Sequence, residues 1–374
     1  MKKIVNQGIF IVFGILISVA LIVLFSLPSE ELNDLTPIKI VANLPLTGPG
    51  SGIGLEDRDG LLLSVDDINS MGGINGRPIE LVIVDNETDL EKAKQLFLET
   101  EQTHKPILHI SSLSFITTGL SVLAEENKVV LIALSAVAPE VTQNKEWTFR
   151  YFPMADAEAT PILQILNDQN ITNLGILYLD DEFGRSITDE VGIKFENTGG
   201  SVFREPFSPN SLDFVENLEN IKNNDAIYIV AFPDYIKIIL KQLHELNYSG
   251  QILTSSDGAT FDIFSMSEAD GVYLAAPILY DQNFQYANKI GISYEMKYNK
   301  QLDYNSANSY DVLRILNGIL DEEKLSTANI RDTLNSGFTY SGIFGKVTSP
   351  PKNHDIEFNL YPAKIVNGEL NFGT

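Results

Sequence analysis

The sequence contains no cysteine and few positively charged side chains, and both shortages restrict what the protein does. Without cysteine, the chain forms no disulfide, offers no thiolate nucleophile or zinc ribbon, and has no lipid-modified cysteine behind a signal sequence. Only 26 lysines and arginines stand against 50 acidic residues, which gives a formal net charge of −24. Because the phosphate backbone of nucleic acids binds clustered cations, we expect no nucleic-acid partner.

Motifs for catalysis and metal binding are also missing. The two nearest histidines, His104 and His109, are five residues apart, which is not the i, i+4 spacing of a helical metal pair. The segment DNETDL (85–90) alternates acids as a calcium loop does, but its last residue stands where that loop requires glycine. No G-x-S-x-G nucleophile elbow occurs. We therefore predict a protein that is not an enzyme and has no metal site and no cofactor.

A glycine-rich loop, LPLTGPGSGIG (44–54), follows an apolar segment that is typical of a strand. A phosphate loop would end in Gly-Lys-Ser/Thr, whereas Gly54 is followed by Leu55 and Glu56. The dinucleotide spacing G-x-G-x-x-G fails as well, since the sixth position is never glycine. The loop is therefore either a flexible strand-to-helix turn or part of a binding cleft, because open α/β sheets bind ligands beyond the carboxyl ends of their strands.

The N-terminus carries a long uncharged segment, with lysines before it and acids after it. This charge pattern predicts an N-terminus inside the cytoplasm and a remainder outside. The segment is long for a signal-peptide core and has no A-x-A site at its end, so an uncleaved anchor is favoured over a removed signal. We expect a cytoplasmic tail at 1–7, a transmembrane anchor or signal at 8–28 and a linker at 29–37. The protein would be a single-pass cell-membrane protein or, after signal cleavage, a secreted or periplasmic one.

Beyond the linker, strand and helix patterns alternate. The expected strands lie at residues 38–44, 79–85, 106–110, 129–135, 173–179, 201–207, 226–232 and 251–256. The expected helices lie at residues 56–70, 89 onward, 117–127, 157 onward, 182–197, 212–222, 234–246, 284–300 and 306–320. The segment WTFRYFPM (147–154) breaks the pattern, which then restarts. Two α/β lobes with parallel, doubly wound sheets are predicted, and the ligands of such proteins usually bind in the crevice between lobes.

A series of segments from Ile38 onward follows the order of one known family. The segments are PLTGPGSGIG, GLLLSVDDINSMGGINGRPIELVIVDNETD, SFITTGLSVLAEENKVVLIALSAVAPEVT, FRYFPMADAEA, GILYLDDEFGRS, AIYIVAFPD, TSSDG and SANSYDVLRILNGIL. They resemble the type I periplasmic solute-binding proteins, typified by the leucine/isoleucine/valine-binding protein of ABC importers. The resemblance implies two Rossmann-like lobes joined by a three-crossing hinge, with residues 38–152 and 278–340 in one lobe and 153–277 and 341–374 in the other.

The resemblance also implies ligand-binding residues in the first lobe. Ile53 in the glycine loop would face the side group of the ligand. Ser114 and Thr117 match a Ser-x-x-Thr that holds a carboxylate at a helix start, where spare N–H donors and the helix dipole favour an anion. Read without the resemblance, both are ordinary helix caps. Ser135 and Ala136 match a cleft position after the next strand, where a serine is otherwise a plain loop residue.

In the second lobe, Asp257 matches an acid that pairs with an amino group, although an aspartate before glycine is otherwise a turn residue. Val137 and Phe183 stand where amino-acid binders carry hydroxyls. Each charged hydrogen bond lost in this way is worth roughly 1.5 to 3 kcal/mol, enough to change the preferred ligand. Phe183 and Phe232 would either pack a flat or apolar ligand or belong to the core.

Together these observations predict an extracytoplasmic solute-binding protein of an ABC importer. It would capture an amino acid of the branched-chain type or a related small amide in the cleft between the lobes and deliver it to an ABC permease. The membrane would be contacted through the N-terminal helix. A membrane-anchored ligand sensor without a transport role is the alternative.

Overall fold

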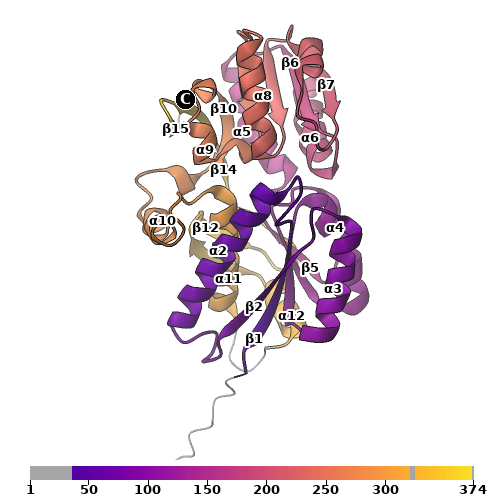
Figure 1. The fold of residues 1–374 in the computed structure, drawn as a ribbon, viewed down its shortest axis with the longest axis vertical. Helices are drawn as coiled ribbons and strands as arrows, with labels where there is room; N and C mark the ends of the chain where they lie inside the picture. Colours follow the sequence, from indigo (N-terminus) through magenta and orange to yellow (C-terminus); the bar gives the residue numbers. More distant parts are fainter. Residues whose placement is uncertain (1–35, 321–324, 373–374) are drawn as a thin grey trace, which may run out of the picture. The chain divides into compact units, whose positions relative to one another are not determined.

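The computed structural model describes residues 36–320 and 325–372. These residues form two large β-sheets with helices packed on their faces (Figure 1). Pro37–Thr374 forms one compact unit. The anchor or signal predicted at 8–28, with the tail and most of the linker, lies outside the described residues. Across the two described stretches, no helix has both the length and the apolar character needed to cross a membrane.

The first sheet has the strand order β13-β5-β4-β3-β1-β2, and all its pairs are parallel. Its strands are β1 (Ile38–Leu44), β2 (Ile79–Asp85), β3 (Leu108–Ser112), β4 (Val130–Leu134), β5 (Thr148–Tyr151) and β13 (Asp355–Ile356). The helices around it are α2 (Ser51–Ser70), α3 (Leu90–His104), α4 (Ser114–Asn127), α11 (Tyr304–Ile319) and α12 (Thr327–Asn335). Because β4 is buried along its whole length, its sequence is a continuous apolar run rather than an alternating one.

The second sheet repeats this design in the order β15-β14-β10-β9-β8-β6-β7. Its strands are β6 (Asn173–Leu179), β7 (Ser201–Phe207), β8 (Ala226–Val230), β9 (Gln251–Thr254), β10 (Tyr273–Pro277), β14 (Leu360–Val366) and β15 (Glu369–Phe372). The accompanying helices are α5 (Ala155–Asp168), α6 (Glu182–Asn197), α7 (Val215–Ile221), α8 (Pro233–Glu245) and α9 (Phe261–Phe264). The first five strands are parallel, whereas β14 and β15 add antiparallel pairs at one edge. The predicted α/β two-lobe fold with parallel sheets is confirmed.

The chain passes between the two sheets three times: after β5, after β10, and between β13 and β14. The segment between β10 and β13 is the longest of these connections. It contains helix α10 (Gln285–Tyr298), α11, α12 and the hairpin of β11 (Phe338–Gly342) and β12 (Gly345–Ser349). The lobe boundary at residue 340 stays a prediction. Strand pairing places the last passage at 357–359, because β13 joins the first sheet.

Most expected elements occur with small shifts at their ends. Strands β6 and β7 and helix α6 have the predicted bounds. Several helices begin earlier than expected, among them α2 at Ser51 rather than at Glu56, α4 at Ser114 rather than at Thr117, and α11 at Tyr304 rather than at Ser306. The segment 147–154 contains a short strand, β5, where a break in the pattern was expected. These differences matter because the added residues belong to the candidate site.

Glycines set the close approach of α2 to its neighbours. A methyl group at Gly60 would lie 2.1 Å from the carbonyl oxygen of Ser306 on α11. At Gly54 it would lie 2.2 Å from the carbonyl oxygen of Pro45. No side chain fits at either position, so α2 packs directly against α11 and against the end of the glycine-rich loop.

Candidate functional site

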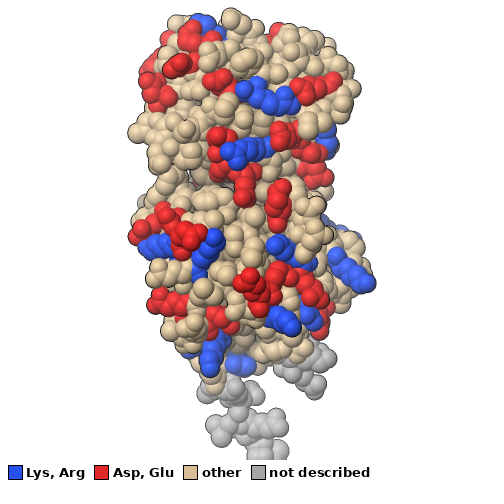
Figure 2. Space-filling view, turned by 90° about the vertical axis from the view of Figure 1, so that its right-hand side faces the viewer, with Lys and Arg blue, Asp and Glu red and all other residues tan. Residues whose placement is uncertain are grey.

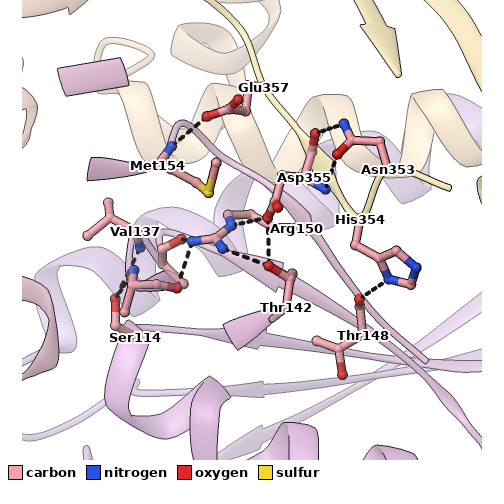
Figure 3. A network of polar contacts seen from close by, with 12 residues as sticks. Ser114, Val137, Thr142, Thr148, Arg150, Met154, Asn353, His354, Asp355 and Glu357 are labelled. Carbon is pink, nitrogen blue, oxygen red and sulfur yellow. Dashed lines mark hydrogen bonds and ion pairs between the residues drawn. The ribbon is translucent and has the colours of Figure 1, made fainter. Parts of the chain in front are cut away.

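The predicted site residues of the first lobe follow the carboxyl ends of neighbouring parallel strands. Ser114 begins α4 after β3, and Ser135 follows β4. The hydroxyl oxygen of Ser114 accepts hydrogen bonds from the backbone N–H groups of Val137 and Ala138, at 3.1 and 3.3 Å (Figure 3). The loop after β4 is therefore fastened to the start of α4. These N–H groups are already engaged within the first lobe.

Thr117 points back into the first lobe. Its hydroxyl lies 2.9 Å from the hydroxyl of Ser111 on β3, and its backbone N–H donates to the carbonyl of Leu113. Ser111 and Thr117 are both fully buried. Thr117 therefore supports the turn that carries Ser114, and its role as a direct ligand contact stays a prediction.

The glycine-rich loop is held in place by the end of β2 rather than being free. Asp85 accepts hydrogen bonds from the backbone N–H groups of Leu46 and Thr47, at 3.0 and 3.2 Å. The hydroxyl of Thr88 accepts from the N–H of Gly50 and donates to the carbonyl of Thr47. Of the two interpretations of this loop, these hydrogen bonds favour an ordered loop that could line a binding cleft over a flexible turn. Of the alternating acids of 85–90, Asp85 holds the loop, Asp89 caps α3 and Glu87 pairs with Lys92. No cluster suited to a metal ion occurs in the described part of the chain.

A chain of hydrogen bonds joins Ser135 to α11 and α2. The Ser135 hydroxyl donates to the side-chain oxygen of Asn305 at 3.0 Å, and the Asn305 amide donates to Glu56 at 3.1 Å. Ser135 itself has a left-handed backbone, with φ of 44°, which is uncommon for serine and typical of functional loops. Sequence reasoning missed Asn305 and Glu56.

Asp57, one turn after Ile53 on α2, is completely buried, and neither carboxylate oxygen has a hydrogen-bond partner of normal geometry. Burial raises the pKa of Asp57 to about 7, and the nearby hydroxyls of Ser112 and Ser135 only partly oppose that rise. Buried polar groups nearly always have partners, so a carboxyl group without one calls for an explanation. Ile53 is buried one helical turn away.

In the second lobe, Phe183 and Phe232 pack against each other with ring centroids 5.4 Å apart. Each follows a strand of the sheet, Phe183 after β6 and Phe232 after β8. Both are buried. Their contact with a ligand stays a prediction.

Asp257 lies in a short turn after β9, beside a second acid that sequence reasoning missed. Glu158 on α5 accepts hydrogen bonds from the hydroxyl of Tyr228 at 3.0 Å and from the N–H of Ser256 at 2.9 Å. Burial and the neighbouring Glu158 raise the pKa of Asp257 to about 8. Burial also raises the pKa of Glu158 to about 7. Two adjacent carboxyl groups without a counterion are thus held at the end of the second sheet.

The first turn of α11 brings the two groups of residues together. Asn305 bonds to Ser135 of the first lobe, while the neighbouring Tyr304 lies close enough to the second lobe that burial, Glu158 and Asp257 raise its pKa. The Tyr304 ring stacks on Phe152 of the first passage, with centroids 5.0 Å apart. Its hydroxyl is buried and has no hydrogen-bond partner of normal geometry. The eight predicted site residues are all buried, and none exposes more than 7% of its surface.

Arg150 fixes the loop after β4 from the other side (Figure 3). Its guanidinium donates to the carbonyls of Ala136 and Ala138 at 2.9 and 3.0 Å and to the hydroxyl of Thr142 at 2.9 Å. It also pairs with Asp355 on β13 at 2.8 Å. Ala136 therefore offers its carbonyl to Arg150, and the loop is linked to the third passage of the chain.

A separate pocket of about 740 Å³ opens beside the first passage, near α6. Its lining includes Glu140, Met154, Glu182, Arg185 and Asp189, and none of the eight predicted site residues. Figure 2 shows one face of the molecule, where acidic and basic side chains are interleaved over both lobes. The pocket is open and strongly acidic, so we assign it no part in the candidate site.

Comparison with known proteins places this architecture in a family. The periplasmic binding protein family matches residues 37–369, and the chain belongs to that family. A relative is the leucine-, isoleucine-, valine-, threonine- and alanine-binding protein of Pseudomonas aeruginosa, 22% identical over 66% of this chain and 68% of the relative. Another is the chemotactic signal transduction system substrate-binding protein of Halobacterium salinarum, 23% identical over 59% of this chain. That match spans only 56% of the length of the relative.

Solved structures with the same fold contain different kinds of ligand. A branched-chain amino acid transporter substrate-binding protein of Streptococcus pneumoniae, in complex with isoleucine, has a TM-score of 0.81 at 21% identity and covers 90% of this chain and 98% of its own. A solute-binding protein of Rhodopseudomonas palustris in complex with 3,4-dihydroxybenzoic acid has a TM-score of 0.80 at 18% identity, with 89% and 95% covered. At such identities the likeness shows the fold alone.

Proposed function

We propose that the chain is an extracytoplasmic solute-binding protein that captures an amino acid or a related small amide for an ABC importer. The single observation that carries this proposal is the convergence at the first turn of α11. There, Asn305 meets Ser135 of the first lobe and Tyr304 lies near Asp257 of the second, so one small ligand would contact both lobes. Binding of this kind favours the closed arrangement of the lobes, because only that arrangement offers both sets of contacts. We expect no catalysis.

The residue roles belong to this proposal. Ser114, with the start of α4, would face the carboxylate or amide oxygen of the ligand. Asp257 would face its amino group, and Ile53 with the Phe183 and Phe232 pair would enclose its side group. The permease partner and the membrane anchor are part of the same proposal, supported by the family and by the charge pattern of the N-terminal segment.

A sensor role is the second candidate, because a relative from Halobacterium salinarum carries a name from chemotactic signal transduction. The two candidates differ in whether the ligand enters the cell. Loss of labelled-ligand uptake on deletion of the gene would favour transport, whereas unchanged uptake would favour sensing.

A thermal-shift panel on the purified full-length protein tests the binding proposal. A specific ligand at a hundredfold excess over its Kd stabilises the folded state by about 2.7 kcal/mol. The panel should contain amino acids, small amides and aromatic acids, and we expect at least one amino acid or amide to raise the melting temperature. If no small solute raises it, the binding proposal is wrong.

A further inference from the structure

Acidic side chains surround the candidate site without basic partners. Asp57 lies on α2 of the first lobe, Glu158 lies on α5 of the second lobe, and Asp257 lies in the turn after β9; all three are buried. No basic side chain of the described residues forms an ion pair with any of these three acids. Lys300, the base near Glu56, is instead bonded to Asp59 at 2.8 Å.

A second and independent observation is that several buried polar groups at the site lack partners. Both carboxylate oxygens of Asp57 and the hydroxyls of Ser112, Thr254 and Tyr304 are buried without a hydrogen bond of normal geometry. Leaving such groups unpaired costs free energy, most of all for a carboxylate. Because Asp57 and Ser112 lie together near Ser135, their missing partner is best supplied by a ligand in the cleft.

The groups that would hold a ligand carboxylate are, in contrast, already occupied. The N–H groups of Val137 and Ala138 donate to Ser114, and the hydroxyl of Thr117 is bonded to Ser111. Val137 also brings no hydroxyl of its own. The site therefore combines three buried carboxyl groups with no basic side chain among the described residues paired to them, which suits a ligand with more positive groups than negative ones.

We infer that the cleft selects a small amino compound of net positive charge, such as a diamino acid or a diamine, with one cationic group against Asp57 and another against Asp257 and Glu158. This inference rests on the proposed function and narrows its ligand class. The pairing of each ammonium with a buried carboxylate gives short, charge-assisted hydrogen bonds that a neutral side group does not form. Branched-chain amino acids, with an apolar side group, leave Asp57 unpaired.

Calorimetry on the full-length protein compares two sets of probes at pH 7.5. The cationic set is lysine, ornithine, arginine and putrescine, and the comparison set is leucine, glutamine and glutamate. We expect at least one cationic probe to bind about thirtyfold or more tightly than every member of the comparison set. If leucine or glutamine binds more tightly than all cationic probes, the charge inference is wrong and the binding function stands. If no probe binds and no small solute raises the melting temperature, both are wrong.

Two matched variants on α2 then test the role of Asp57. Asp57→Asn keeps the shape but removes the charge, and the best cationic probe should bind about a hundredfold or more weakly. Asp66→Asn makes the same change at an exposed position, paired only with Lys297, and should bind as the parent does. The melting temperature of each unliganded variant shows whether it is folded. Parent-like affinity of a folded Asp57→Asn variant for the cationic probe would overturn the inference.

Discussion

Arg150 and Asp57 are charged residues in the same lobe, and neither exposes any of its surface. The guanidinium of Arg150 donates to two carbonyls, a hydroxyl and the carboxylate of Asp355. The carboxylate of Asp57 has no hydrogen-bond partner of normal geometry, although the hydroxyls of Ser112 and Ser135 lie nearby. A buried charged group with all its hydrogen bonds formed links parts of the chain. A buried carboxylate without such bonds costs free energy, and that cost is removed when a ligand pairs with it or when it takes up a proton.

Arg150 and Asp57 therefore have different roles: Arg150 supports the structure around the candidate site, and Asp57 is a candidate ligand contact. Arg150 joins the loop after β4 to β13, so it fixes where Ala136 and Ala138 lie. Asp57 has no ion pair among the described residues, and burial raises its pKa more than the hydroxyls of Ser112 and Ser135 lower it. Stability and affinity should therefore respond in opposite ways to changes at these two positions.

Replacing Arg150 should have the largest effect on stability. Arg150→Met removes the guanidinium, so Asp355 loses its ion-pair partner and keeps Thr142 as a donor, while two buried carbonyls lose the guanidinium donor. Breaking a buried pair in this way typically costs about 3 to 5 kcal/mol. Urea unfolding, read as the change in midpoint at constant slope, measures this loss.

Arg185→Met is the matched control for that experiment. Arg185 pairs with Asp180, but both side chains are exposed, at 55% and 43%, so the loss should stay below about 1 kcal/mol. Equal losses from the two variants would mean that burial of the Arg150 network contributes nothing beyond a surface ion pair.

Asp57→Asn should change stability in the opposite direction, with a pH dependence that identifies the cause. Burial raises the pKa of folded Asp57 from an ordinary 3.8 to about 7, with Glu56 as the neighbouring acid and the hydroxyls of Ser112 and Ser135 opposing the rise. Between these values the folded state binds more protons than the unfolded state, so the contribution of Asp57 to stability falls as pH rises from about 4 to about 7.

The variant should therefore match the parent near pH 4 and exceed its stability above pH 7 by up to about 4 kcal/mol. Denaturant unfolding of unliganded parent and variant at pH 4.5 and pH 8 measures the difference. Asp66→Asn should show no such gain, since Asp66 is exposed and paired with Lys297. A variant less stable than the parent at pH 8 would show that Asp57 supports the fold.

Local patterns predicted much of the fold, because strands and helices of this size carry their own signals. Helix α6 begins with Asp181, whose side chain accepts from the N–H of Gly184, and its predicted start was correct. Strand β5 was not recognised, since it spans only four residues and contains Arg150, whose partner Asp355 lies 205 residues away. A buried arginine in a short segment gives no strand signal until its distant partner is known.

The candidate site was predictable only in part for the same reason. Residues after strand ends, such as Ser114 and Ser135, were found because resemblance and strand order place them at one edge. Asn305 was missed because α11 was expected to begin at Ser306, and its bond to Ser135 spans 170 residues. Glu158 was missed because an acid in a helix usually faces solvent, and nothing nearby in the sequence indicates its contact with Tyr228.

The smallest effects are expected for two buried tyrosines that differ only in whether the hydroxyl is bonded. The hydroxyl of Tyr151 donates to Asp311 at 2.6 Å, so Tyr151→Phe leaves a buried acceptor short of its donor and should cost about 1 to 3 kcal/mol of stability. The hydroxyl of Tyr304 has no partner of normal geometry, so Tyr304→Phe should leave stability unchanged within about 0.5 kcal/mol. Ligand affinity should respond in the reverse order. Tyr304→Phe would lose one hydrogen bond to the ligand, about five- to tenfold in Kd, while Tyr151→Phe would bind nearly as the parent does. Unfolding curves and calorimetry on both variants decide the point, and a Tyr304→Phe variant that loses stability but keeps its affinity would place this hydroxyl with Arg150 in the framework rather than with Asp57 in the cleft.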